Sequence, residues 1–595
     1  MVLGGYTGKV LRVDLTTGQC RVCPIPTEDM LTYIGGRGLA AKFLYDEVRP
    51  GTEPFSPENR LCIFTGPLTG TRIPFTAKYA VATKSPLTGG FTRSISGGYF
   101  PVELKLAGYD GLIISGRAEH PVYLWLRNEE VEIRDARSLW GLTVTETEKR
   151  IREELGSSAV RVATIGPAGE KLVRFASVMN DSFEAAARGG PGAVMGSKNL
   201  KAIAVLGRKP VPVADPGLLE ETMSRAYGAI VSHPGYVSRL RAGVMETVPL
   251  VYRYNMASVR HYSAKPFSRL EAFEPRSLVE RFVTEENSCF GCPHKCLKQT
   301  AVREGLWAGC ATQGPKYETI CMFGPNCDND DMASIIKANE ICTDYGLDTA
   351  SAGNVVAFAM EFAERGLLTP EDFRGVPVGF GSGESLVHLL YSIVTRQGLG
   401  DLLAEGVLRA SSALGRDARQ LAMHVKGQEM GSFDPRGYPA MGLAYATSNR
   451  GACHMGPPFR LDQWWVHKKP DDAGRWATVG KARVVVDVQN LYVLLDSMLF
   501  CSFSRYGFDP DLYMTCLKAV TGWDLSWEHA NELANAIYSL ERSFNVREGF
   551  SAAHDTLPER FLQGDRGIPL EPMLREYYQL RGWDEKGAPK NVPSQ

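Results

Sequence analysis

Short runs of alternating apolar and polar residues dominate the chain up to about residue 209, and this period of two predicts β-strands. Such runs occur at Lys9 to Leu15, Val122 to Leu126 and Leu200 to Leu206. The second run is expected to pair with Val131 to Ile133 across a turn at Asn128. The N-terminal part of the chain is therefore predicted to be mostly β-sheet.

A different pattern begins after the linker-like stretch 207–212, where apolar residues recur at intervals of three and four, as on one face of a helix. This pattern predicts helices at Leu218 to Ser232, Met332 to Thr343, Ala352 to Arg365, Ser385 to Arg396, Leu402 to Leu414, Lys481 to Leu495 and Trp527 to Phe544. We therefore expect an α+β fold with an N-terminal β-sheet domain at residues 1–209. Two mainly α-helical domains should follow at 210–416 and 417–595.

The composition excludes several classes of protein. At 595 residues, 44% hydrophobic and 22% charged, the chain can form several domains and bury a large cofactor. With a formal net charge of -1, the chain lacks the excess positive charge expected of a protein that binds nucleic acid or an anionic membrane. The sequence shows no signal peptide and no apolar run long enough to span a membrane. Its 13 cysteines do not resemble the disulfide framework of a small secreted domain, which favours a reducing cytoplasm.

Three cysteines within eight residues, Cys289, Cys292 and Cys296, are the strongest chemical signal in the sequence. A CxxC turn directs two thiolates toward one point, and a third cysteine one helical turn later can join them. No second CxxC or HxxxH follows closely, so a fourth ligand must come from farther away, and Cys501 is a candidate. This spacing favours an iron–sulfur cluster over a structural zinc ion, with unligated thiols as the remaining alternative.

A weak internal repeat places an aspartate at the end of two predicted helices, at Asp344 and Asp496. A carboxylate is unfavourable at a helix C-terminus, which already carries partial negative charge. A pair of equivalent ligand contacts would explain both residues. Two solvated aspartates in turns between helices are the simpler explanation, because aspartate is common in turns.

An ordered set of short motifs accompanies these features: GGRGLA at 35–40, TGPLTG at 65–70, KSPLTG at 84–89, SGGYF at 96–100, AGYD at 107–110 and GGPGAVMGSKN at 189–199. Together with the cysteines and the aspartate turns, this set resembles the aldehyde:ferredoxin oxidoreductase family over almost the whole chain. These are tungsten enzymes in which two pterin dithiolenes surround one metal beside a four-iron cluster. The resemblance implies a β-sheet domain that cradles the pterins and two helical domains that close over them.

The resemblance also implies a role for three sets of residues. One [4Fe-4S] cluster would take Cys289, Cys292, Cys296 and Cys501. The two pterins would be gripped by the aspartate turns, at Asp344, Leu347 and Asp348 in the first and at Asp496, Leu499 and Phe500 in the second. The pterin phosphates would meet cations and backbone amides at Lys78, Ser96, Gly97, Gly98, Arg188, Gly189 and Gly190.

Three positions depart from the family pattern. Lys78 stands where the family usually has an arginine, and lysine neutralises a phosphate without the planar fork. Ile95 stands where the family often has asparagine, so the magnesium ion that bridges the two phosphates in the family would be absent or ligated differently. Leu499 replaces a glycine, so the second turn is expected to close without a residue that tolerates positive φ.

For catalysis, the family places a glutamate and a histidine near the metal, and the matching residues are Glu318 and His454. Burial would raise the pKa of such a glutamate, and a nearby imidazole could hydrogen-bond a substrate carbonyl. The resemblance thus implies oxidation of an aldehyde to a carboxylic acid, with electrons passing through the cluster to ferredoxin or an iron–sulfur partner subunit. Tungsten and molybdenum are not distinguished, and homo- and hetero-oligomers are both open.

Two other functions are compatible with the sequence. The first is the catalytic subunit of the benzoyl-CoA reductase branch of the same family, which reduces an aromatic ring. Cys321, as a tungsten ligand, and His261 would match features of that branch, although Cys321 could equally be an ordinary core cysteine. The second is a non-catalytic electron-transfer protein or a zinc-stabilised scaffold.

Overall fold

The computed structural model describes residues 3–263, 266–368, 370–373, 375–376, 378–458 and 472–590. Its first part contains two six-stranded sheets, with strand orders β2-β1-β6-β3-β4-β5 and β11-β10-β9-β12-β7-β8. The strands of the first sheet are β1 (Lys9–Asp14), β2 (Gln19–Pro24), β3 (Leu61–Phe64), β4 (Tyr79–Lys84), β5 (Phe91–Ser96) and β6 (Gly111–Ser115). Those of the second are β7 (Val122–Arg127), β8 (Glu130–Asp135), β9 (Arg161–Thr164), β10 (Val178–Asn180), β11 (Glu184–Ala186) and β12 (Leu200–Leu206).

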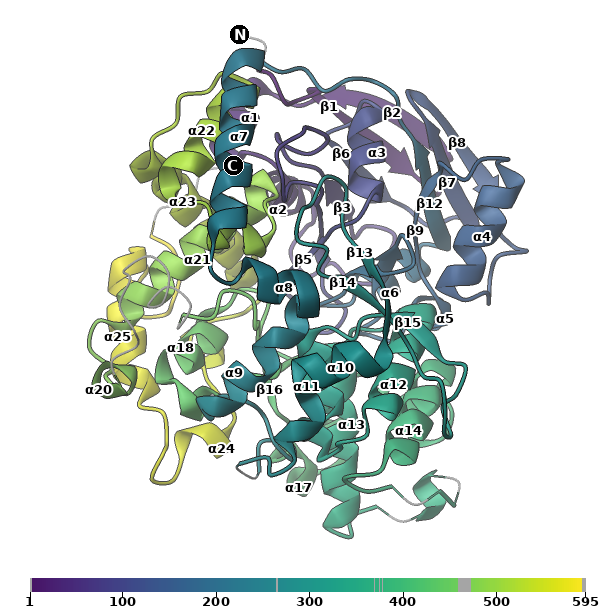
Figure 1. Ribbon diagram of the computed structural model, residues 1–595, viewed down its shortest axis with the longest axis vertical. Helices are drawn as coiled ribbons and strands as arrows, with labels where there is room; N and C mark the ends of the chain where they lie inside the picture. The colour runs from purple at the N-terminus through teal and green to yellow at the C-terminus, as the bar shows by residue number, and fades with distance from the viewer. Residues whose placement is uncertain are drawn as a thin grey trace.

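The alternation of side chains along each strand divides this part into layers. Leu61 and Ile63 of β3 face a core shared with the second sheet, where they join Leu124 of β7. Cys62 and Phe64, on the opposite face of β3, pack toward α2 (Gly36–Glu47). Figure 1 shows the two sheets together in the upper part of the view, with α4 (Val144–Glu154) beside the second sheet. The predicted β7–β8 hairpin is confirmed, with Leu124 opposite Ile133.

Helices dominate the rest of the described chain, which confirms the predicted α+β class. Short helices also occur in the first part, at α1 (Thr27–Tyr33), α3 (Phe100–Leu106), α5 (Pro167–Glu170) and α6 (Pro191–Ser197). The middle part contains α7 (Pro216–Ser232), α8 (Tyr236–Ala242), α9 (Thr247–Arg253), α10 (Pro275–Phe282), α11 (Tyr317–Phe323), α12 (Met332–Tyr345), α13 (Thr349–Glu364), α14 (Gly383–Thr395), α15 (Leu399–Leu403), α16 (Val407–Leu414) and α17 (Arg416–Arg419). The last part contains α18 (Pro439–Thr447), α20 (Asp472–Arg475), α21 (Lys481–Met498), α22 (Pro510–Thr521), α23 (Trp527–Arg547), α24 (Glu559–Leu562) and α25 (Leu570–Arg581).

One predicted helix is wrong. The stretch Leu402 to Leu414 forms the end of α15 and all of α16, separated by Gly406 at φ 84°. A buried carboxylate stabilises the break, because Glu429 Oε1 accepts a hydrogen bond from the Val407 amide at 3.0 Å, at the start of α16. The apolar spacing continues across the break, so periodicity alone could not reveal it.

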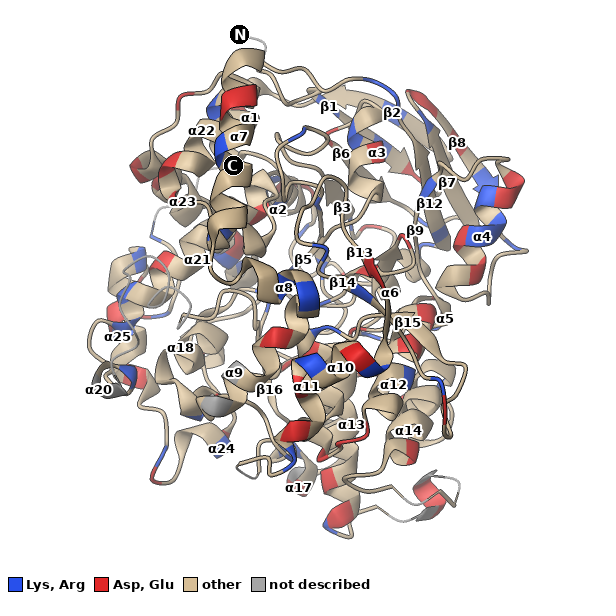
Figure 2. Cartoon of the chain, viewed as in Figure 1, with Lys and Arg blue, Asp and Glu red and all other residues tan. Residues whose placement is uncertain are grey.

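Two small sheets were not predicted. β13 (Val283–Asn287), β14 (Leu297–Ala301) and β15 (Ala311–Gln313) form an antiparallel sheet, and β16 (His424–Val425) pairs with β17 (Gln428–Glu429). Among the described residues, no helix is both long enough and apolar enough to cross a membrane. Acidic and basic residues are dispersed over the fold (Figure 2), as the near-zero net charge would suggest.

Candidate functional site

The four predicted cluster cysteines line one cavity of about 100 Å³. Cys289, Cys292 and Cys296 lie on the loop that joins β13 to β14, and this loop is built from turns rather than from the expected helical turn. Cys501 arrives from the end of α21, where its amide donates to the Phe75 carbonyl at 2.8 Å. One water molecule occupies about 30 Å³ in the liquid, so the cavity is several times larger than one water. The four thiols therefore surround an open space and do not converge on a single atom position. Among the described residues, no His, Cys, Asp or Glu group is arranged around a single metal ion.

The cysteine cavity touches the glycine turn that follows β5. Lys78 lines the cavity together with Glu184 and Lys316. A Cβ added to Gly97 would lie 2.8 Å from Cys289 Sγ and 3.1 Å from Lys78 Nζ, so only a glycine allows this approach. The predicted phosphate turn and the predicted cluster site are thus direct neighbours.

The rest of this turn is fixed by side chains of the second sheet. Ser96 Oγ donates to Asn180 Oδ1 at 2.7 Å, and Asn180 Nδ2 donates to the Gly97 carbonyl at 2.8 Å. Asp181 accepts the Tyr99 amide at 2.7 Å beside Gly98, which has φ 104°. The second carboxylate oxygen of Asp181 is buried without a hydrogen-bond partner.

The two aspartate turns share one backbone geometry. α12 ends at Gly346 with φ 78° and ψ 59°, and α21 ends at Leu499 with φ 64° and ψ 39°. Each of these left-handed residues donates its amide to the carbonyl four positions earlier, Cys342 and Leu495 respectively. Leu499 therefore adopts the positive φ that was not expected of it.

The shared geometry bears on the predicted pterin contact of Asp344. When Gly346 is matched to Leu499, Thr343 rather than Asp344 falls opposite Asp496. The Asp344 carboxylate is only partly buried and accepts a hydrogen bond from Thr145 Oγ1 of α4 at 2.6 Å. The fully buried carboxylate of the first turn is Asp348, which caps α13 by accepting the Ala350 and Ser351 amides.

Neighbouring glycines make room for the side chain of Leu499. A Cβ on Gly36 would lie 2.8 Å from Leu499 Cγ, and a Cβ on Gly66 would lie 3.2 Å from Leu499 Cβ. Leu499 and Phe500 are both buried. Leu499 thus packs against glycines of the N-terminal part of the chain. The left-handed conformation costs a leucine about 1–2 kcal/mol, which its burial offsets.

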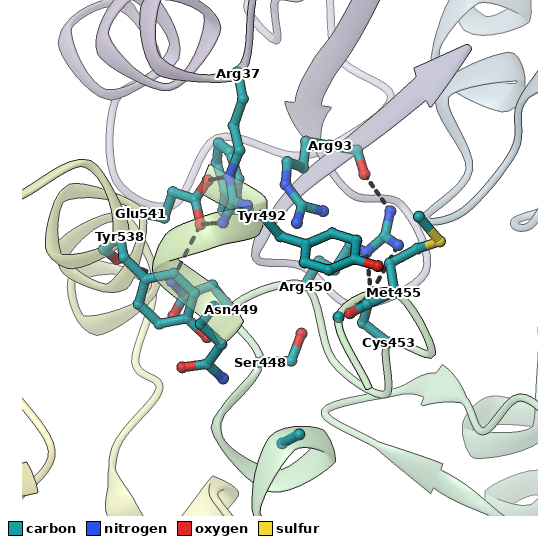
Figure 3. Close-up of a pocket in the computed structure, with 14 residues that line it drawn as sticks. Arg37, Arg93, Ser448, Asn449, Arg450, Cys453, Met455, Tyr492, Tyr538 and Glu541 are labelled. Atoms are coloured by element: carbon teal, nitrogen blue, oxygen red, sulfur yellow. Dashed lines mark hydrogen bonds and ion pairs between the residues drawn. The ribbon is translucent and has the colours of Figure 1, made fainter. Parts of the chain in front are cut away.

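Asp496 lies in a buried network of charged groups. Arg37 and Arg93 both approach Asp496 Oδ2, at 3.3 Å and 3.2 Å. Arg37 also forks onto Glu541, with nitrogen–oxygen distances of 2.6 Å and 2.8 Å. Figure 3 shows the Arg93 guanidinium between this Arg37–Glu541 pair and Arg450. The network ties α2, β5, α21 and α23 together around the second turn.

The predicted phosphate residue Arg188 bridges three parts of the fold. Its guanidinium lies 3.3 Å from Asp348 Oδ2 and donates to the Glu429 carbonyl at 2.5 Å and the Ala452 carbonyl at 2.6 Å. The Nε atom is buried without a hydrogen-bond partner. Gly189 and Gly190, which follow it, have φ 87° and 79° and lead into the N-terminus of α6.

Glu318 and His454 meet although they are far apart in sequence. Glu318 lies in the first turn of α11, and His454 lies on the loop after α18. The Oε1 atom of Glu318 and the Nδ1 atom of His454 are 3.8 Å apart. Ser432 holds the carboxylate, donating from its amide to Oε1 and from its hydroxyl to Oε2, each at 2.7 Å. Burial raises the pKa of Glu318, although the Ser432 hydrogen bonds and Arg188 oppose this shift.

The approach of these two residues depends on Gly431. A Cβ at Gly431 would lie 2.3 Å from Glu318 Oε1 and 3.3 Å from the His454 Cβ. The backbone carbonyl of Gly431 accepts the Tyr262 hydroxyl at 2.5 Å. Sequence reasoning missed Gly431, Ser432 and Arg93; Arg37, by contrast, lies inside the quoted GGRGLA motif and could have been singled out.

Cys321 and His261 are both buried in the protein interior. Cys321 is fully buried on α11, one turn after Glu318. Burial raises the pKa of its thiol well above the ordinary value. His261 is also fully buried, with Nδ1 2.6 Å from Glu361 Oε2. Three consecutive residues, Arg260, His261 and Tyr262, have positive φ, an uncommon run for residues with side chains.

Comparisons with known proteins agree with this geometry. Residues 10–207 match the family described as aldehyde ferredoxin oxidoreductase, N-terminal domain, and residues 221–592 match aldehyde ferredoxin oxidoreductase, domains 2 & 3. The chain belongs to the aldehyde ferredoxin oxidoreductase family.

Relatives of this family member align over nearly its full length. A tungsten-containing aldehyde ferredoxin oxidoreductase of Pyrococcus abyssi is 40% identical over 606 aligned positions, covering 98% of this chain and 97% of that protein. An aliphatic sulfonate oxidoreductase, WOR-like subunit, of Pyrococcus furiosus is 30% identical and covers 98% of this chain and 96% of its own length. Among solved structures, the active-site complex BamBC of benzoyl coenzyme A reductase matches with a TM-score of 0.85 and 28% identity, covering 99% of this chain and 96% of that one. The predicted family is confirmed.

Proposed function

We propose that this chain oxidises an aldehyde to a carboxylic acid and passes the electrons through a four-iron cluster to ferredoxin or to an iron–sulfur partner subunit. The observation that carries this proposal is the largely buried pair of Glu318 and His454, in which Oε1 and Nδ1 lie 3.8 Å apart and Ser432 holds the Glu318 carboxylate. The tungsten-containing aldehyde ferredoxin oxidoreductases at 39–40% identity support the same reaction.

Each residue of the pair has a distinct role in this reaction. The Glu318 carboxylate takes a proton from the water molecule that adds to the aldehyde carbon. Because burial raises its pKa, Glu318 is a stronger base than an exposed glutamate. His454 donates a hydrogen bond to the carbonyl oxygen as negative charge develops there. Arg188 fixes the loop that carries His454, through its hydrogen bond to the Ala452 carbonyl.

The residues around the two turns fit a large polar cofactor. Several buried polar atoms have no hydrogen-bond partner there, among them Arg188 Nε, Asp181 Oδ1 and Ser497 Oγ. We propose that a tungsten bis-pterin group binds at this place, where it would accept the two electrons of the oxidation. Asp496 and Asp348, rather than Asp344, are the carboxylates positioned for its amide and amine donors. A magnesium ion between the pterin phosphates stays a prediction.

The cysteine cavity fits an iron–sulfur cluster. Thiolates are the ligands that such clusters take, and the four cysteines enclose a space of about 100 Å³. Lys78 and Gly97 join this cavity directly to the proposed pterin site, so electrons have a short route out. A ferredoxin or an iron–sulfur partner subunit would then receive them one at a time.

Replacing Glu318 by glutamine tests the proposed reaction. A matched control exists in Glu148, a buried glutamate that accepts the amide and hydroxyl of Ser182, each at 2.7 Å, as Glu318 does with Ser432. We expect Glu318→Gln to keep its tungsten and iron but to lose ~10²-fold or more in aldehyde turnover with a dye acceptor. Glu148→Gln should retain normal turnover. Near-normal turnover in Glu318→Gln would remove Glu318 from the mechanism.

A second candidate is reduction of an aromatic acyl thioester, as in the benzoyl-CoA reductase branch. Two observations favour it: the structural match to BamBC, and the burial of Cys321 one turn from Glu318. If Cys321 coordinates tungsten, X-ray absorption should detect one more sulfur ligand than two dithiolenes provide, and Cys321→Ser should lose it. Aldehyde oxidation retained in Cys321→Ser would favour the aldehyde assignment.

A further inference from the structure

A second chemical feature lies directly beside His454. Cys453 is 5% exposed, and the Arg450 guanidinium forks onto its sulfur, with Nε 3.0 Å and Nη2 2.7 Å from Sγ. The only carbonyl oxygen recorded near this sulfur among the described residues belongs to Met455, 3.7 Å away. Two close N–H donors and one distant acceptor favour the thiolate over the thiol, because a thiolate accepts hydrogen bonds and a thiol donates one.

Positive charge surrounds this sulfur from several elements. Burial raises the pKa of the Cys453 thiol, but Arg450, Arg93 and Arg188 outweigh burial, and the pKa falls below its ordinary value. The Arg37–Glu541 pair lines the far side of the same pocket, and His454 follows in the chain. All 13 cysteines lie in the described part of the chain. Burial raises the thiol pKa of ten of them, whereas the pKa of Cys453 is lowered.

The pocket beside Cys453 has room for a small oxygen species and an unused donor for it. Its volume is about 30 Å³, and about 10–15 Å³ already holds one water molecule. Arg93 lines this pocket, is 7% exposed, and has a buried Nε with no hydrogen-bond partner. Figure 3 shows the Arg93 guanidinium directed into the space between Arg37 and Arg450. An N–H donor buried without a partner points to an oxygen ligand, because leaving it unmet is costly.

We propose that Cys453 is an oxidation site for hydrogen peroxide. The thiolate attacks one peroxide oxygen, so that an S–O bond forms and the O–O bond breaks. The departing hydroxide takes the proton of the new S–OH group and leaves as water. Sulfur loses two electrons to the peroxide and becomes a sulfenate, whose oxygen occupies the pocket beside Arg93 Nε.

Oxidation at this position would reach the proposed active site through the backbone. Arg450 also donates a hydrogen bond to the Arg93 carbonyl of β5 at 2.6 Å. Arg188 donates to the Ala452 carbonyl. The loop from Arg450 to His454 is therefore attached to β5 at its start and to Arg188 near its end. A sulfenate oxygen would change the partners of the Arg450 fork. We expect His454 to shift and aldehyde turnover to fall, a consequence that rests on the proposed function.

The chemical test does not depend on aldehyde turnover. Anaerobically purified holoenzyme is treated briefly with hydrogen peroxide at pH 6, 7 and 8, quenched with catalase, and unfolded in denaturant containing dimedone to trap sulfenate. Peptide mass mapping then gives the oxidation rate of Cys453, with Cys20, the exposed cysteine of β2, as an internal control. An ordinary thiol with a pKa near or above 8.5 should oxidise almost 100-fold faster at pH 8 than at pH 6. The corresponding ratio for Cys453 should be clearly smaller than that for Cys20, because Arg450, Arg93 and Arg188 lower the pKa of the Cys453 thiol.

Replacing Arg450 supplies a second test. In Arg450→Gln the fork and its charge are lost, so the oxidation rate of Cys453 should regain a steep dependence on pH. The proposal is overturned if Cys453 in the wild type stays unmodified while Cys20 is oxidised, or if both show the same dependence on pH. The wild-type profile decides the matter even if Arg450→Gln fails to fold. Because mass mapping detects the dimedone label without any activity assay, the oxidation proposal is tested independently of the aldehyde assignment.

Discussion

Adding one methyl group at Gly431 should disable the Glu318–His454 pair without disturbing the fold. Gly431 does not have a positive φ, so alanine can adopt its backbone conformation. The added Cβ would lie 2.3 Å from Glu318 Oε1, about 1 Å inside an ordinary carbon–oxygen contact of about 3.3 Å. The carboxylate must therefore move by about 1 Å, which would break at least one of its two hydrogen bonds to Ser432.

The size of the effect follows from those hydrogen bonds. A hydrogen bond to a charged group contributes about 1.5–3 kcal/mol, and each 1.36 kcal/mol in the barrier is tenfold in rate, so kcat should fall by roughly 10- to 150-fold. A misplacement of about 1 Å in an active site has costs of similar size.

Aldehyde oxidation with a dye acceptor measures this loss, alongside tungsten and iron content. Gly228→Ala is the control, because Gly228 lies exposed in α7 with no atom within 4 Å of an added Cβ. We expect Gly431→Ala to keep its metals and lose turnover, while Gly228→Ala keeps both. If Gly431→Ala retains its metals and turns over within about threefold of the wild type, Gly431 does not position Glu318 as described.

Three further predictions follow from the described geometry. Cys501→Ala should lose iron as fully as Cys292→Ala, because the two cysteines line the same cavity. Full iron content and an unchanged EPR signal of the reduced cluster in Cys501→Ala would contradict this. Asp496→Asn should lower the pterin released per chain whereas Asp344→Asn should not, because Asp344 is bound to Thr145; equal losses would restore Asp344 as a ligand. Burial raises the pKa of Glu148 to about 7, above its unfolded value of about 4.3, so wild-type stability should fall as pH rises through this window, by roughly 4 kcal/mol. Glu148→Gln should therefore raise the melting temperature more at pH 8 than at pH 5, and an equal change at both would refute the shift.

Local patterns predicted much of the fold and part of the site. The β7–β8 hairpin and the helices α7, α12, α13 and α21 followed from periods of two and of three to four. Spacing marked the cysteine loop, and the family resemblance supplied Cys501. Both lie at one cavity in the structure.

The remaining features depend on contacts between distant segments, which periodicity does not record. The break at Gly406 is stabilised by Glu429, and the left-handed Leu499 is accommodated by Gly36 and Gly66. In the shared geometry of the two turns, Thr343 rather than Asp344 falls opposite Asp496. This register depends on the left-handed conformation of Leu499, which was not predicted. The Arg37–Glu541 pair likewise joins two ends of the chain and has no local signature.

Elemental analysis of protein purified without oxygen tests the central claim most directly. The four-cysteine cavity and the polar atoms left without partners around the two turns predict about four irons and one tungsten or molybdenum per chain. Stoichiometric zinc without iron would contradict the account.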